Sequence, residues 1–163
     1  RNPSALHYHF GSRDGLVRAI VERHMQAMES ERTQTLDNLD DADLVEVVNM
    51  VVMPIAGLLR SAEGRDFLRI AAQLAELSGV RSAKPSTDIV NTALAVQLDR
   101  LEALIAEHIG RQRARERVAS LVTFLTASLA ERARALERST RPPMTHERYV
   151  DELITMLAAA MAA

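Results

Sequence analysis

The stretch from Leu44 to Arg60 constrains the fold most, because it places apolar residues nearly all round a helix. Such a helix is buried on most of its sides, so other helices have to surround it. Pro54 inside the stretch predicts a kink or one unpaired carbonyl group. Asn49 is a lone polar residue among the apolar ones. It fits a hydrogen-bonded core residue and a residue that orients a ligand equally well.

Apolar residues at helical spacing also occupy most of the remaining chain. The predicted helices cover residues 13–32, 44–60, 65–77, 88–109, 113–137 and 145–163. Gly110 ends one helix, Pro142 and Pro143 stop the next, and Thr145 caps the last. Aromatic residues make up 3% of the chain and β-branched residues form no alternating runs, which argues against a sheet. The predicted fold class is therefore all-α.

The composition limits the classes of function that are open to the chain. Its 163 residues carry a net charge of −2, so any contact with nucleic acid has to come from a local basic patch. The chain has no cysteine, which excludes disulfides and thiol chemistry and fits a cytoplasmic protein. No signal peptide is visible. The longest apolar run, Val47 to Leu59, is too short to span a bilayer, so no membrane partner is expected.

The first twenty residues have the pattern of a short helix, a tight turn and the start of a long helix. Leu6 and Phe10 are four residues apart and share a helix face, so both can anchor in a core. Gly11 can end the short helix in a left-handed conformation. Ser12 is a good N-cap for the long helix, and Asp14 places a negative charge in its first turn. This arrangement is typical of a recognition helix that enters the DNA major groove.

The same stretch resembles the end of the helix-turn-helix of the TetR family of transcriptional regulators. The family pattern there is roughly Ala-Leu-Tyr-Tyr-His-Phe, two linker residues, Lys-Glu and an apolar helix. In this chain Arg13 and Asp14 replace the Lys and the Glu, while His7 and Gly15 are mild departures. The match covers about a tenth of the chain. The residues that carry it are Ala5, Leu6, Tyr8, His9, Phe10, Gly11, Ser12, Leu16, Ala19 and Ile20.

The resemblance implies a ligand-responsive, DNA-binding regulator, expected to be a repressor that a small apolar effector releases from operator DNA. Residues 1–32 would then form the end of the helix-turn-helix head and its connecting helix, and residues 33–163 the ligand-binding and dimerisation domain. Two further helices precede this stretch in the family, so we expect them upstream of Arg1. The alternative is a protein that lacks half of its DNA-binding helix-turn-helix head. The residues expected near bases are Arg1, Asn2 and Ser4, and those expected to hold phosphates are Tyr8, His9 and Arg13.

An effector cavity is expected among the helices that start near residues 13, 44, 65, 88 and 113. Met25 and Met28 can be flexible core filler or cavity lining, and the sequence leaves both possibilities open. The candidate ligand-binding residues are Met25, Met28, Asn49, Met53, Phe67, Ala71, Leu74, Leu98, Leu121 and Phe124.

The last two predicted helices are amphipathic and joined by a short loop, so they form an antiparallel pair. Their apolar stripes exceed what one intramolecular contact covers, and pairing with a second copy into a four-helix bundle would bury the excess. The resemblance implies the same homodimer. The candidate interface residues are Val118, Leu125, Leu129, Val150, Leu153, Leu157 and Met161.

Other classes of function have less support in the sequence. An all-helical dimeric interaction protein without DNA binding is the main alternative. An enzyme is not expected, because no Glu-x-x-His pair, phosphate loop or nucleophile motif is present. No cofactor or metal is expected, since the histidines lack the spacing of a ligand set. The acidic residues at 37–43 and the basic run at 111–117 are best explained as solvated helix ends.

Overall fold

The computed structural model describes residues 13–77, 92–138 and 143–163, although not the side chains of residues 13–20 and 74–77. The described residues form α-helices and two short 3-10 helices and contain no strand, which confirms the all-α prediction. The bounds are α2 (Arg13–Thr33), η1 (Leu36–Asn38), α3 (Leu44–Gly57), η2 (Leu58–Arg60), α4 (Ala62–Leu77), α5 (Ala93–Ile109), α6 (Arg111–Arg138) and α7 (His146–Ala162).

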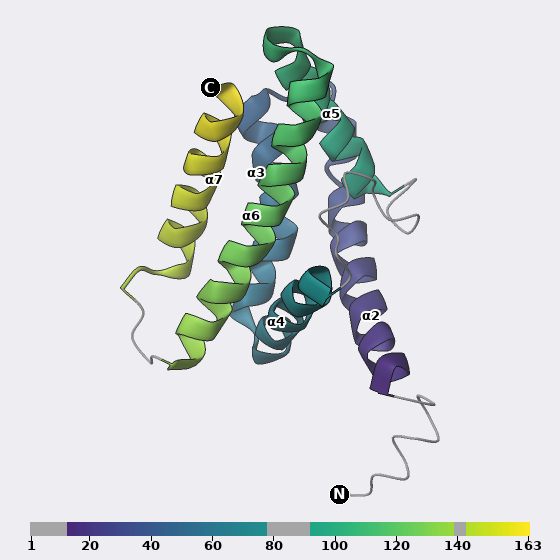
Figure 1. Cartoon of the computed structure of the whole chain (residues 1–163), viewed down its shortest axis with the longest axis vertical. Coiled ribbons are helices and arrows are strands. Elements are labelled where there is room, and N and C mark those ends of the chain that lie inside the picture. The colour runs from purple at the N-terminus through teal and green to yellow at the C-terminus, as the bar shows by residue number, and fades with distance from the viewer. Residues whose placement is uncertain (1–12, 78–91, 139–142) are drawn as a thin grey trace, which may run out of the picture.

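The helices are arranged around α3. Figure 1 shows α6 in front of α3, α7 on one side, and α4 and α5 on the other. Helix α2 contacts α3, α4 and α5, and its N-terminal end extends away from the rest of the body. None of the helices in the described ranges is long and apolar enough to cross a membrane.

Short-range signals set the helix ends. The Asp43 side chain accepts a hydrogen bond from the backbone N–H of Glu46, whose carboxylate accepts one from the N–H of Asp43. This capping box starts α3. Thr145 caps α7, and Gly110 ends α5 with a φ of 82°, both as predicted.

The start of α5 differs from the prediction. The sequence pattern predicted a helix from residue 88, but Thr92 has an extended backbone and its hydroxyl accepts a hydrogen bond from the N–H of Ala95. Thr92 is therefore the N-cap, and the helix begins at Ala93. Residues 88–91 lie outside the described ranges. Helix α6 begins at Arg111, directly after Gly110, and not at residue 113.

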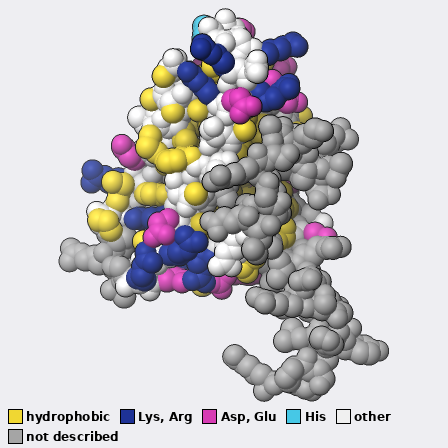
Figure 2. All heavy atoms as spheres, in the orientation of Figure 1, with side chains coloured by type: hydrophobic (Ala, Val, Ile, Leu, Met, Phe, Trp, Pro, Cys, Tyr) yellow, Lys and Arg dark blue, Asp and Glu magenta, His cyan; other side chains and the backbone are white. Residues whose placement is uncertain are grey.

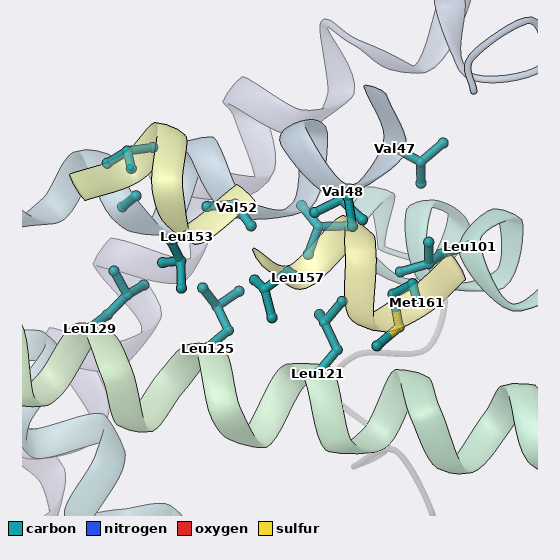
Figure 3. Close-up of a cluster of buried hydrophobic side chains, with 14 of the residues drawn as sticks. Val47, Val48, Val52, Leu101, Leu121, Leu125, Leu129, Leu153, Leu157 and Met161 are labelled. Carbon is teal, nitrogen blue, oxygen red and sulfur yellow. The ribbon is translucent and has the colours of Figure 1, made fainter. Parts of the chain in front are cut away.

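The main core lies between α3, α6 and α7. In Figure 3, Leu121, Leu125 and Leu129 of α6 point toward side chains of α7, with Val48 and Val52 of α3 beside them. Each of these five residues is at most 4% exposed. The facing residues of α7 are Leu153, Leu157 and Met161.

Helix α3 is less completely buried than predicted. Its inner residues, such as Val47 and Val52, are fully enclosed. Val45, Asn49 and Met53, spaced four residues apart, form an exposed stripe on the opposite side. The prediction of burial was therefore wrong for this stripe, because no helix of the described residues covers that side of α3. Helix α3 also continues past Pro54 and changes to the 3-10 geometry of η2 only at Leu58.

Candidate functional site: the α2 joint and the α4–α6 cleft

Where the side chains are described, helix α2 contacts α4 through charged groups around Glu63 and through a ring contact. Nη1 of Arg23 lies 3.2 Å from Oε1 of Glu63. Nε2 of His24 lies 4.0 Å from the same carboxylate oxygen, and the His24 ring packs on the ring of Phe67 with centroids 4.7 Å apart. The Arg23 and Glu63 side chains are 76% and 61% exposed, so water screens their attraction.

Hydrogen bonds from α2 itself and from Thr35, just after its C-terminal end, connect this part of the chain to α5. The carboxylate of Glu29 accepts a hydrogen bond from the N–H of Ala93, the first residue of α5. A negative charge is favourable there because the helix dipole is positive at the N-terminus. Further along α5, Nε2 of Gln97 donates to Oγ1 of Thr35 at 3.1 Å, and that hydroxyl donates to the Arg32 carbonyl at 2.8 Å.

Arg32 connects α2 to α3 from inside the core. Arg32 is only 3% exposed, and its Nη2 donates a hydrogen bond to the carbonyl of Val51 at 3.4 Å. Its Nε has no hydrogen-bond partner among the described residues. Burial lowers the pKa of Arg32, while the carboxylates of Glu29 and Glu31 act in the opposite direction. The guanidinium is therefore desolvated with incomplete hydrogen bonding. We call these contacts of α2 with α3, α4 and α5 the α2 joint.

A surface cleft lies beside the α2 joint, between α4 and α6. It has a volume of about 550 Å³, which is within the range of small-molecule sites. Figure 2 shows basic and acidic side chains gathered over α4 and the C-terminal end of α6. The residues that line this α4–α6 cleft are Glu63, Asp66, Phe67, Arg69, Ile70, Gln73 and Arg134.

The charges of the cleft are paired with one another or with neighbours. Arg69 forms ion pairs with Asp66 and with Glu137 of α6. Arg134 lies 3.1 Å from Glu131, which also accepts a hydrogen bond from Arg138 at 2.8 Å. The bonds from Arg138 and then Arg134 hold the pKa of Glu131 below its ordinary value.

The structure places the candidate effector residues in several different environments. Phe67 lines the cleft, and Met28 and Leu121 are buried in the core. Met25, Ala71 and Leu98 are half-buried against that core. The side chain of Leu74 lies outside the described residues.

Three candidate effector residues lie on the surface and do not line an internal cavity. Asn49 is exposed, and Met53 and Phe124 are 44% and 46% exposed. Each lies on the side of its helix that faces away from the neighbouring helices, so this part of the cavity prediction was wrong.

The candidate interface residues require a correction of the same kind. All seven are at most 8% exposed in the single chain, where they fill the core between α3, α6 and α7. They therefore cannot form the surface that a second copy contacts. The residues are Val118, Leu125, Leu129, Val150, Leu153, Leu157 and Met161. The exposed apolar residues of these helices are instead Val122 and Phe124 on α6 and Met156 on α7.

The structure does not test the predicted DNA contacts of the helix-turn-helix. Arg1, Asn2, Ser4, Tyr8 and His9 lie outside the described residues. Arg13 begins α2, but its side chain is not described. In the described ranges no three His, Asp or Glu side chains come together in a way that could hold a metal ion.

Sequence reasoning missed the polar residues of the α2 joint. Arg32 follows Met28 by four residues, on the stripe that also contains Val21 and Met25. Gln97 lies between Ala93 and Leu101 on the buried stripe of α5. A polar residue in phase with an apolar stripe is a signal that could have identified both. The pairing of Glu63 with Arg23 had no such signal, because the two residues are forty positions apart.

Comparison with family models, with curated proteins and with solved structures finds no match to this chain.

Proposed function

We propose that the chain is part of a ligand-responsive DNA-binding transcriptional regulator of TetR type, acting as a repressor that a small molecule releases from its operator. The observation that carries the proposal is the position of α2. This helix directly follows the stretch that resembles a recognition helix, and its side chains bond to α3, α4 and α5. A change in the packing of the body would therefore move the segment that precedes α2.

The α2 joint supports a switch because its contact with α4 can be exchanged at low cost. The pair of Arg23 with Glu63 is exposed, whereas the buried Arg32 guanidinium donates to the Val51 carbonyl and keeps α2 attached to α3. An effector changes the balance between two orientations of α2 only as far as it binds one of them better. In the released state the two heads of a dimer would no longer match successive major grooves.

The homodimer that this function needs would form through the exposed side of the last two helices. Met156 of α7 is 44% exposed, and the small residues Ala159 and Ala160 lie next to it on the surface. Val122 and Phe124 of α6 are 38% and 46% exposed and point to different sides of that helix, so only one of them can extend this surface. Figure 2 shows exposed apolar side chains along α7 and the adjoining part of α6. Pairing two copies across this surface would bury it. These residues replace the buried leucines as the proposed interface.

A gel shift of the protein on the DNA that flanks its own gene, repeated across salt concentrations, tests the proposal. Tight and salt-sensitive binding to one fragment in the presence of competitor DNA is the expected result. Weak binding that is equal on all fragments would contradict it and favour the alternative, a dimeric interaction protein without DNA binding. Because Tyr8 is proposed to hold a phosphate, Tyr8→Phe should weaken binding about equally on all sequences.

A further inference from the structure

Phe67 and Ile70 are the apolar residues among those that line the α4–α6 cleft. Phe67 is 3% exposed and lines the cleft together with the half-buried Ile70. On its side away from the cleft, the Phe67 ring packs on the His24 ring of α2. A planar apolar group in the cleft would therefore contact α4 directly and α2 through one aromatic ring.

The charged groups around this surface differ in how firmly they are held. Arg69 lies between two carboxylates, and Arg134 shares Glu131 with Arg138. Glu63 has only the exposed Arg23 and the more distant His24 as partners among the described residues. A ligand can displace an exposed, monodentate ion pair at little cost. Glu63 is therefore the lining charge that is most available to a ligand, and a carboxylate attracts a cation.

We infer that the α4–α6 cleft binds an organic cation with a planar apolar body, whose charged group contacts Glu63 and whose ring system lies on Phe67 and Ile70. The cation replaces Arg23 at the Glu63 carboxylate. Binding therefore removes the Arg23 ion pair, one of the contacts that hold α2 to α4. The inference names the chemistry of an effector and rests on the proposed function only for its effect on DNA.

Three indole compounds of similar size but different charge test whether the charge or the shape of a ligand determines its affinity for the cleft. Tryptamine carries an ammonium group, tryptophol a hydroxyl group and indole-3-acetate a carboxylate. The chain contains no tryptophan, so the indole emission of each compound can be followed by fluorescence anisotropy during titration with protein. Tryptamine should bind about three- to fivefold more tightly than the other two, since its ammonium group would pair with a largely exposed carboxylate. Equal or tighter binding of indole-3-acetate, or no binding of any of the three at millimolar concentration, would overturn the inference.

Substitutions on the two sides of the ion pair give opposite expected effects. Glu63→Gln keeps the size of the side chain and should weaken tryptamine binding about three- to fivefold. Arg23→Gln removes the competing cation and should strengthen binding several-fold. Glu152→Gln, at an exposed position of α7, is the matched control and should leave the affinity unchanged. Loss of binding in all three variants, or in none, would contradict the assignment of Glu63.

A gel shift with and without tryptamine separates this inference from the proposed function. Glu63-dependent tryptamine binding by a protein that shows no specific DNA binding would support the cleft and reject the regulator. Specific DNA binding by a protein that binds tryptamine no better than tryptophol would reject the cleft as a cation site and leave the regulator standing.

Discussion

The core between α3, α6 and α7 and the α2 joint hold the same chain together by different means. In the core, Leu121, Leu129 and Leu157 are at most 3% exposed and make only apolar contacts with the neighbouring helices (Figure 3). In the joint, Arg23 and Arg32 bond to groups on α4 and α3. The free energies involved differ accordingly. Burying one leucine contributes about 1.5–3 kcal/mol, whereas an exposed ion pair contributes about 0–1 kcal/mol.

We infer from this difference that the two regions have different roles. The core keeps the body intact in any functional state, because breaking it exposes large apolar surfaces. The joint can lose or exchange single contacts without unfolding the body. Elements that move are drawn from such low-stability regions. We therefore assign stability to the core and the switching movement to α2.

The largest expected effect is in the core. Leu129→Ala removes most of a side chain that is 0% exposed, and should lower the free energy of unfolding by about 2–5 kcal/mol. Chemical denaturation measures the change. Val45→Ala, at a position that is 51% exposed, is the control and should change it by less than about 0.5 kcal/mol. Similar losses in the two variants would remove the distinction between core and surface.

Substitutions of two glycines test how tightly the chain packs where α4 meets the end of α3. A Cβ at Gly64 would lie 2.2 Å from the carbonyl oxygen of Leu58, so Gly64→Ala should cost about 1–3 kcal/mol. At Gly57 no atom lies within 4 Å of a Cβ and the backbone is helical, so Gly57→Ala should stabilise the protein by about 0.4–1 kcal/mol. Thermal unfolding distinguishes the two. A neutral Gly64→Ala variant would show that α4 is not fixed by this close approach.

A smaller effect on stability is expected in the α2 joint. Arg23→Gln should change the free energy of unfolding by less than about 0.5 kcal/mol, because the pair with Glu63 is largely exposed. Chemical denaturation of the variant beside the parent protein gives this value. A loss above about 2 kcal/mol would mean that the joint is as important for stability as the core.

The smallest effect concerns the start of α7. Burial, and then the positive charges of Arg60 and Arg132, lower the pKa of His146 below its ordinary value. The folded state therefore favours the neutral imidazole. Its contribution to stability is present above the unfolded pKa of about 6.5 and is lost as the pH falls through the folded pKa. His146→Gln should flatten the decline in thermal stability below that pH, and an unchanged decline would exclude His146 as its source.

The sequence predicted those parts of the fold that depend on local rules. Helical periodicity placed the helices, and Thr145 and Gly110 marked ends that the structure confirms. Helical periodicity did not predict which neighbouring helix covers a given helix face. The periodicity of α6 identifies Leu125 and Leu129 as one apolar stripe, but the same stripe could face α7 or a second copy. Phe124 shows the converse, since it was expected to line a ligand cavity and it lies 46% exposed.

The candidate site was harder to predict for the same reason. Phe67 was expected to contact a ligand, and it lines the cleft. The charged residues around it come together only through the packing of α4 on α6 and α2, over separations such as that between Arg69 and Glu137. No local spacing predicts such pairs, because exposed glutamates and arginines also occur along α2, α6 and α7.

Segment-resolved hydrogen exchange of the protein in its native state tests the division between core and joint most directly. Amides of α2 between residues 21 and 28 should exchange through openings of much lower free energy than amides of α6 and α7 around Leu125 and Leu157. Saturating tryptamine should change the protection of that part of α2 and leave the protection around Leu125 unchanged. If α2 exchanges only through global unfolding, with the same free energy as α6 and α7, then α2 is not an independently movable element and the account is wrong.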